Sequence, residues 1–321
     1  MRLLKLVPDN TNFKFLKWRN LAMAISIALI IGSIALIAIR GLNFGVDFAG
    51  GLMMEVRFSQ DARLDDLRRT VNSAGAGEGS LQTFGQADTV SIRLPLPPGD
   101  EDAVQQVVQQ VQSAIRDKHP NAEFRRVETV SGKVSAELVR DGALAILFAM
   151  IGISLYIWFR FEWQFGVGAL FALVHDVALT LGFFALTQLE FNLNIVAAVL
   201  TIIGYSLNDT IVVYDRIREN LRKYRKMDIE SVLDLSVNET LSRTIVTSLS
   251  MVIALGTLVV LGGDVLFGFS VAMLLGIGIG TYSSIFIGAP ILIWLGVGPH
   301  SFLPPEAGPA AGAERREKPA A

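Results

Sequence analysis

Long apolar stretches dominate the chain and are separated by polar segments. Six stretches carry few or no charged side chains, and they span residues 21–39, 142–159, 165–186, 193–214, 244–263 and 266–295. An apolar helix of about 20 residues crosses the hydrocarbon core of a bilayer. The pattern therefore predicts six transmembrane helices and the fold class of an α-helical membrane protein.

Residues 41–140, between the first two apolar stretches, have a different periodicity. Period-two alternation predicts strands and helical spacing predicts helices, in the order β-α-β-β-α-β, at residues 52–58, 64–71, 81–84, 90–94, 104–115 and 122–130. This order is that of the ferredoxin-like α+β fold. One span, this domain and five further spans resemble half of a transporter built from two such halves.

The distribution of Lys and Arg predicts the orientation in the membrane. These residues are frequent before the first apolar stretch and in the loop after the fourth, whereas the short loops "LEFN" and "GDV" on the opposite side carry none. By the positive-inside rule, both termini are cytoplasmic and residues 41–140 are extracytoplasmic. The first stretch is longer than the apolar part of a typical secretory signal, so we expect it to be retained as a span.

The chain is thus expected to have five parts. They are a cytoplasmic N-terminal segment at 1–20, the first transmembrane helix at 21–40, an extracytoplasmic domain at 41–140, transmembrane helices two to six at 141–295, and a cytoplasmic tail at 296–321. The tail is rich in Pro, Gly and Ala and has little to bury, so we expect it to be disordered.

Composition agrees with a membrane protein and argues against several other classes. Of 321 residues, 51% are hydrophobic and 18% charged, and the mean hydropathy is +0.47. The net charge of -2, without a basic patch, gives no reason to expect a nucleic-acid partner. Cysteine and the phosphate-binding G-x-x-x-x-G-K-[ST] motif are absent, and the three histidines lack metal-ligand spacing. We therefore expect no enzyme activity, cofactor or metal site.

The fourth apolar stretch contains a carboxylate, Asp209. Such a group costs several kcal/mol in hydrocarbon unless it is paired, hydrated or protonated. Ser206 and Thr210 share its helix face, and Asn208 adjoins it. The nearest cation in a neighbouring span is Arg243, which antiparallel packing would bring to a similar depth. We expect a protonatable carboxylate that engages Arg243 when ionised; a structural or snorkelling ion pair is the alternative.

Two further features interrupt the apolar stretches. His175 and Asp176 lie near the middle of the third, where they could relay protons or could form a buried pair that hydrogen-bonds between helices. Gly276 and Gly280 in the sixth form a G-x-x-x-G pattern, which predicts close approach of another helix.

A glycine-rich segment, "GLNFGVDFAGG", connects the first span to the extracytoplasmic domain. Gly45, Gly50 and Gly51 surround Asp47 and allow tight turns where the chain leaves a helix and enters a strand. We expect Asp47 to hold this turn in place; binding of a partner is the alternative.

Several of these segments resemble the SecD/SecF family of protein-export membrane proteins, within the RND superfamily. The similar segments are "GLNFGVDFAGG" at 41–51, "FRFEW" at 159–163, "ALVHD" at 172–176, "IIGYSLNDTIVVYDRIREN" at 202–220 and "SRTIVTS" at 242–248. The resemblance covers nearly the whole chain apart from the N-terminal lead and the tail, and is to the smaller, SecF-type members.

This resemblance implies a subunit that, with SecD as a separate chain, uses the proton-motive force to promote protein translocation through SecYEG. Asp209 and Arg243 match residues implicated in proton conduction in the family. H⁺ is the expected coupling ion and Na⁺ the alternative. The implied location is the bacterial inner membrane, as a multi-pass protein. The implied partners are SecD, the SecYEG translocon, the preprotein and membrane lipids, with YajC a further candidate. The alternatives are an RND-type transporter of lipids or small molecules and a non-transporting scaffold.

Overall fold

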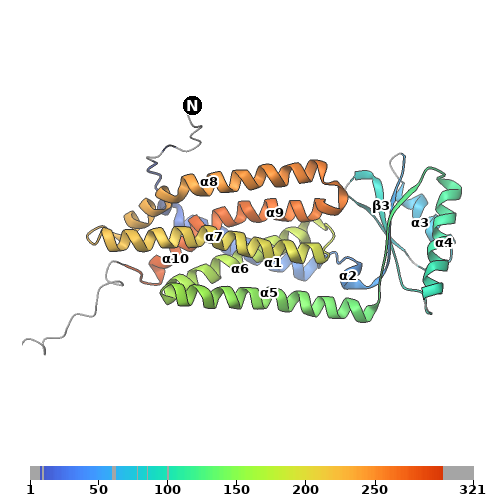
Figure 1. The fold of residues 1–321 in the computed structure, drawn as a ribbon, viewed down its shortest axis with the longest axis horizontal. Coiled ribbons are helices and arrows are strands. Elements are labelled where there is room, and N and C mark those ends of the chain that lie inside the picture. Colours follow the sequence, from blue (N-terminus) through green and yellow to red (C-terminus); the bar gives the residue numbers. More distant parts are fainter. Residues whose placement is uncertain are drawn as a thin grey trace, which may run out of the picture.

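The structure is a computed structural model that describes residue 8 and residues 11–59, 63–77, 79–84, 86–99 and 101–298. Figure 1 shows an elongated molecule, with long helices side by side at one end and a small sheet with two helices at the other. Of the tail expected to be disordered, at 296–321, residues 299–321 lie outside the described residues.

The helical bundle contains the six predicted membrane spans, which the structure confirms as helices. The bundle elements are η1 (Phe15–Trp18), α1 (Arg19–Arg40), α5 (Gly132–Arg160), α6 (Trp163–Thr187), α7 (Leu193–Lys223), α8 (Ile229–Leu261), α9 (Gly263–Ser283), the π-helical turn η2 (Ser284–Gly288) and α10 (Ala289–Trp294).

Helices α7 and α8 extend well beyond the apolar stretches that predicted them. The expected fourth span stopped at Tyr214, yet α7 continues to Lys223, and α8 begins at Ile229 rather than near Thr244. Charged side chains in the extension are paired, as between Arg216 and Glu219 at 3.0 Å. Backbone hydrogen bonding does not require apolar side chains, so a hydropathy pattern marks the membrane-spanning part of a helix rather than its ends.

The predicted ferredoxin-like domain is confirmed. Its strands and helices are β1 (Gly51–Arg57), α3 (Leu64–Ser73), β2 (Ser80–Phe84), β3 (Gln86–Leu94), α4 (Glu101–Lys118) and β4 (Glu123–Val130). The sheet order is β2-β3-β1-β4, and the neighbouring strands pair antiparallel. A short helix, α2 (Val46–Ala49), precedes β1.

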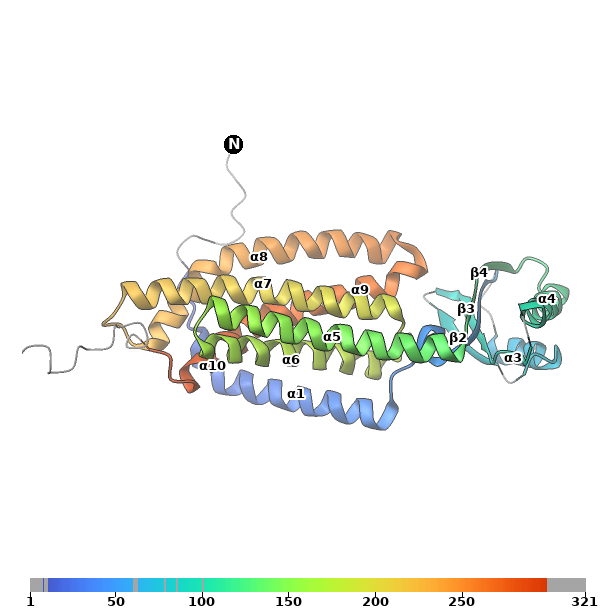
Figure 2. The ribbon, with the colours of Figure 1, turned by 60° about the horizontal axis from the view of Figure 1, so that its bottom comes forward.

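The two faces of this sheet have different neighbours. Helices α3 and α4 cover the face directed away from the bundle (Figure 2), and the domain core lies between them and the sheet. Leu52, Met54, Ile92 and Leu94 belong to that core. Because side chains alternate along a strand, intervening residues such as Arg93 lie on the face toward the bundle.

Candidate functional site between the membrane helices

Three helices bring a cluster of polar side chains together inside the bundle. His175 and Asp176 of α6 are both 0% exposed. The Asp176 carboxylate accepts hydrogen bonds from Ser206 of α7 and from Ser283 of α9, the latter at 2.9 Å. His175 Nδ1 lies 2.9 Å from the other carboxylate oxygen. Asp176 therefore links three helices through side-chain hydrogen bonds.

Asp209, the carboxylate expected to be functional, has its own set of partners. Thr244 Oγ1 of α8 donates to Asp209 Oδ1 at 2.6 Å, and Ser284 Oγ of η2 donates to Oδ2 at 2.8 Å. Asp209 is half-buried, whereas Thr244 and Ser284 are buried. Two hydroxyl donors thus bind this carboxylate at the edge of the bundle interior.

Adjacent residues connect the two carboxylates. Ser206 and Asp209 are three residues apart on α7 and so lie one turn apart on a similar face. Ser283 and Ser284 are consecutive at the junction of α9 and η2, and each binds a different carboxylate. Both carboxylates are thus bound by hydroxyl groups, which can both donate and accept hydrogen bonds. π-helical turns such as η2 are frequent at functional sites.

Close packing of α9 on α7 keeps this cluster compact. A Cβ added to Gly280 would lie 3.0 Å from Cβ of Ser206, and one added to Gly276 would meet the side chain of Ile202. The G-x-x-x-G pattern therefore marks the helix contact that it predicted. At the end of η2, the Gly288 carbonyl oxygen accepts a hydrogen bond from the Tyr214 hydroxyl of α7 at 3.0 Å.

His175 contributes a second buried polar atom. Its Nε2 is buried and has no hydrogen-bond partner in the described part of the chain. Among the described residues, the imidazole ring is therefore hydrogen-bonded through Nδ1 alone. The interhelix hydrogen-bonding pair expected from the sequence is present; the relay role remains a prediction.

Arg243 does not contact Asp209 directly. Among the described residues, no ion pair joins them, and Arg243 is exposed on α8, although its charge still acts on Asp209. Thr244, the next residue, makes the contact instead. Successive helix residues are rotated by about 100°, so two neighbours cannot both face α7. Asn208 is likewise exposed.

Two serines of the site, the last residue of α9 and the first of η2, were not predicted from the sequence. Ser283 and Ser284 occur in "TYSSIF", inside an apolar stretch, and their hydroxyls were the available signal. The cluster combines carboxylates on α6 and α7 with hydroxyls on α7, α8, α9 and η2, and it depends on packing that no single stretch of sequence contains. Within the described residues, no three His, Cys, Asp or Glu side chains gather as a metal site.

The glycine-rich segment lies at the opposite end of α7. Gly50 and Gly51 have φ values of 71° and 120°, which favour glycine, and they lead from α2 into β1. Asp47 does not bind its own turn: its Oδ2 accepts a hydrogen bond from the backbone N–H of Leu193 at 2.9 Å. The segment thus contacts the first residue of α7.

Comparison with solved structures defines the class of protein. The structure is similar to a crystal structure of SecDF, a translocon-associated membrane protein from Thermus thermophilus, with a TM-score of 0.83 and 32% identity over 91% of this chain and 40% of that chain. SecDF in a super-membrane-facing form gives a TM-score of 0.66 and 34% identity, covering 89% and 39%. The chain spans about two fifths of these proteins. It is a multi-pass membrane protein of the RND-type fold.

Sequence comparison gives the family. The profile described as "Protein export membrane protein SecD/SecF, C-terminal" matches residues 110–298, and the "SecD/SecF GG Motif" matches residues 35–62. Protein translocase subunits SecF from Rickettsia bellii and Rickettsia felis are 47% and 46% identical over 90% of this chain, covering 95% and 94% of the relatives. The chain belongs to the SecD/SecF family and has a role in the Sec pathway.

Proposed function

We propose that this chain works with SecD, as a separate polypeptide, to use the proton-motive force for protein translocation through the SecYEG channel. Its relatives are named protein translocase subunits, and the chain matches about two fifths of a SecDF protein, which supports a complex in which SecD supplies the remaining part. The bacterial inner membrane, with both termini cytoplasmic, is the corresponding location. YajC and membrane lipids are further proposed partners.

The observation that carries this proposal is the position of Asp209. It is an ionisable group inside a membrane helix, bound by hydroxyls and only half-buried. Ionisable residues at membrane depth are rare and commonly mark ion pathways. Asp209 is therefore our candidate for the group that gains and loses the transported proton, with H⁺ as the coupling ion and Na⁺ as the alternative. His175, Asp176 and Ser206 are proposed neighbours in this pathway.

The exposed surface beside Asp209 supports a role for Arg243. Helix α8 buries little of its apolar length within the chain, and Arg243 lies on that free surface. Loss of the charge on Asp209 would weaken the hydrogen bonds from Thr244 and Ser284 and the attraction to Arg243. Helices α7 and α8 then shift against each other and against SecD. One charge crossing the membrane contributes about 2.3 kcal/mol per 100 mV, enough to bias two conformers that differ by a few kcal/mol.

Export into sealed membrane vesicles tests the proposal. Translocation is measured with ATP alone and with ATP plus a proton gradient, for the wild type and for Asp209→Asn. The variant should still assemble with SecD but lose the gradient-dependent increment. Asp215→Asn is the matched control, since Asp215 lies on the same helix, is 61% exposed and pairs with Arg160 outside the cluster. A full increment in Asp209→Asn would reject the proposal.

A further inference from the structure

Two loops meet where the bundle joins the extracytoplasmic domain. Phe44, just after α1, and Phe191, between α6 and α7, form a parallel bridge. The N–H of Phe191 donates to Asn43 O at 2.8 Å, and the N–H of Gly45 donates to Phe191 O at 2.9 Å. A Cβ on Gly45 would lie 2.6 Å from Glu190 Oε1 and 3.1 Å from Asn192 Cβ, so a larger residue here would displace the Glu190 side chain.

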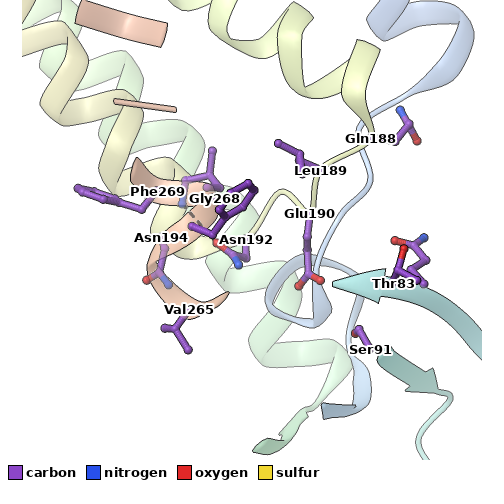
Figure 3. Close-up of a pocket in the computed structure, with 13 residues that line it drawn as sticks. Thr83, Ser91, Gln188, Leu189, Glu190, Asn192, Asn194, Val265, Gly268 and Phe269 are labelled. Carbon is purple, nitrogen blue, oxygen red and sulfur yellow. Dashed lines mark hydrogen bonds between the residues drawn. The ribbon is translucent and has the colours of Figure 1, made fainter. Parts of the chain in front are cut away.

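An ion pair connects these loops to the sheet. Arg93 of β3 lies 2.6 Å from Glu190, and the two side chains are only 15% and 8% exposed. Arg93 also donates to Phe44 O at 2.7 Å and to Asn43 Oδ1 at 3.2 Å. Figure 3 shows Glu190 extending from the loop toward the strands that carry Thr83 and Ser91. One arginine therefore binds both loops to the face of the sheet opposite the domain core.

The same region holds the beginning of α7. Asp47 Oδ2 accepts from the N–H of Leu193, the first residue of α7, at 2.9 Å, and the Asn192 side chain accepts from Ile195 N–H at 3.3 Å. A carboxylate at a helix N-terminus also interacts favourably with the helix dipole. Because α7 is continuous, Asp209 lies about 24 Å along the same helix at 1.5 Å per residue.

A small cavity lies in this region, beside Glu190 (Figure 3). It is lined also by Ser91, Gln188 and Asn192, and its volume of about 70 Å³ holds a few water molecules. The Arg93–Glu190 ion pair beside it is a direct contact. If the start of α7 moved away from the sheet, the nearly buried ion pair between Arg93 of β3 and Glu190 would break.

We propose that Asp47, Arg93 and Glu190 form a coupling joint that makes the start of α7 and the sheet of the extracytoplasmic domain move as one body. A displacement of α7 caused by a proton at Asp209 is thereby delivered to the domain outside the membrane. The inference rests on the proposed function, because it needs a proton-driven movement of α7. The three residues are positioning residues, at a distance from the proton-binding group.

Removal of the ion pair is the first test. Glu190→Gln and Arg93→Gln should each reduce the gradient-dependent increment in export about tenfold, the size of effect expected when a coupling contact is lost. The ATP-only rate and assembly with SecD should be unchanged, and the double variant should be no worse than either single variant. Asp88→Asn is the control, since it breaks the Arg57–Asp88 pair at 2.8 Å in the same domain, away from the joint.

A covalent bond across the joint separates coupling from stability. The chain has no natural cysteine, so a disulfide between Phe44→Cys and Phe191→Cys can be studied alone. These two positions are paired across the bridge, which brings the two loops together. In the Glu190→Gln background, the oxidised pair should restore the increment, and reduction should remove it again. Equal activity of the oxidised and reduced forms would overturn the inference.

A conservative pair of variants provides an independent measurement if the cysteine protein does not assemble. Asp47→Asn keeps an oxygen that can accept from Leu193 N–H and should retain most of the increment, whereas Asp47→Leu should lose it. Equal gradient-dependent increments in Asp47→Asn and Asp47→Leu would overturn the inference. A wild type without any gradient-dependent increment would instead reject the proposed function, so the two failures are distinguishable.

Discussion

The two carboxylates inside the bundle, Asp176 and Asp209, lie in connected surroundings that differ in access. Asp176 is 0% exposed, and within the described residues its carboxylate is bound by His175, Ser206 and Ser283. Asp209 is half-buried and reaches α8, whose outer surface this chain leaves uncovered. One acid is fully enclosed, and the other is partly exposed.

This difference indicates a division of roles. A buried carboxylate with several donors stabilises the packing that it connects, and removing it leaves those donors unsatisfied. An acid that exchanges protons during a transport cycle needs a route to water or to a partner surface. Asp209 meets that requirement better than Asp176. The depth of an acid in the membrane therefore says less about its role than its exposure and partners do.

Loss of Asp176 should give the largest effect on stability. Asp176→Ala would remove the acceptor of the buried Ser206 hydroxyl, the partner of His175 Nδ1 and one of the two acceptors of Ser283. We expect a loss of about 3–5 kcal/mol in the free energy of unfolding, as for other broken buried networks. Asp209→Asn should cost less than about 1 kcal/mol, because the amide keeps an oxygen that can accept a hydrogen bond.

Reversible denaturation of the protein in detergent micelles measures both variants under the same conditions. Equal losses for Asp176→Ala and Asp209→Asn would break the comparison, since they would show that both acids serve mainly in packing.

Local periodicity was sufficient to predict much of the fold. Six apolar stretches gave the six spans, and the alternation around Met54 and Ile92 gave the strands of a ferredoxin-like domain that the structure confirms. These signals succeed because each element needs an apolar face of its own periodicity. The ends of α7 and α8 were placed too near the membrane, because their extensions are polar helices.

The contacts within the candidate site were less predictable, since they depend on how helices rotate against one another. Arg243 was expected to face Asp209, but Thr244 occupies that position. Ser283 and Ser284 resemble other small residues of an apolar helix until η2 places them on two carboxylates. Likewise, nothing near Asp47 in the sequence indicates its contact with Leu193, 146 residues away.

Gly280 gives a test of intermediate size at the enclosed end of the cluster. Gly280→Ala would place a methyl group 3.0 Å from Cβ of Ser206 and push that donor away from Asp176. We expect a loss of about 1–3 kcal/mol in unfolding free energy, typical of overpacking. Gly278→Ala is the matched control, because no heavy atom lies within 4 Å of its added Cβ. It should change stability by less than about 0.5 kcal/mol. Similar results for both would show that the α7–α9 contact is not tight.

Asp88, outside the membrane, provides a reference carboxylate and the smallest expected effect. Arg57 donates to it at 2.8 Å, and this hydrogen bond holds the pKa of Asp88 below its ordinary value of 3.8. The pair therefore adds stability above the unfolded-state pKa, and that contribution is lost as pH falls through the lower folded-state pKa. Asp88→Asn should flatten this part of the acid dependence and leave stability near neutral pH almost unchanged, because water screens the pair.

Amide hydrogen exchange in β3, measured across this pH range in the full chain, checks the result. If the acid dependence of stability were the same in Asp88→Asn and the wild type, Arg57 would not perturb Asp88. Asp88 could then not serve as a reference carboxylate for Asp176 and Asp209.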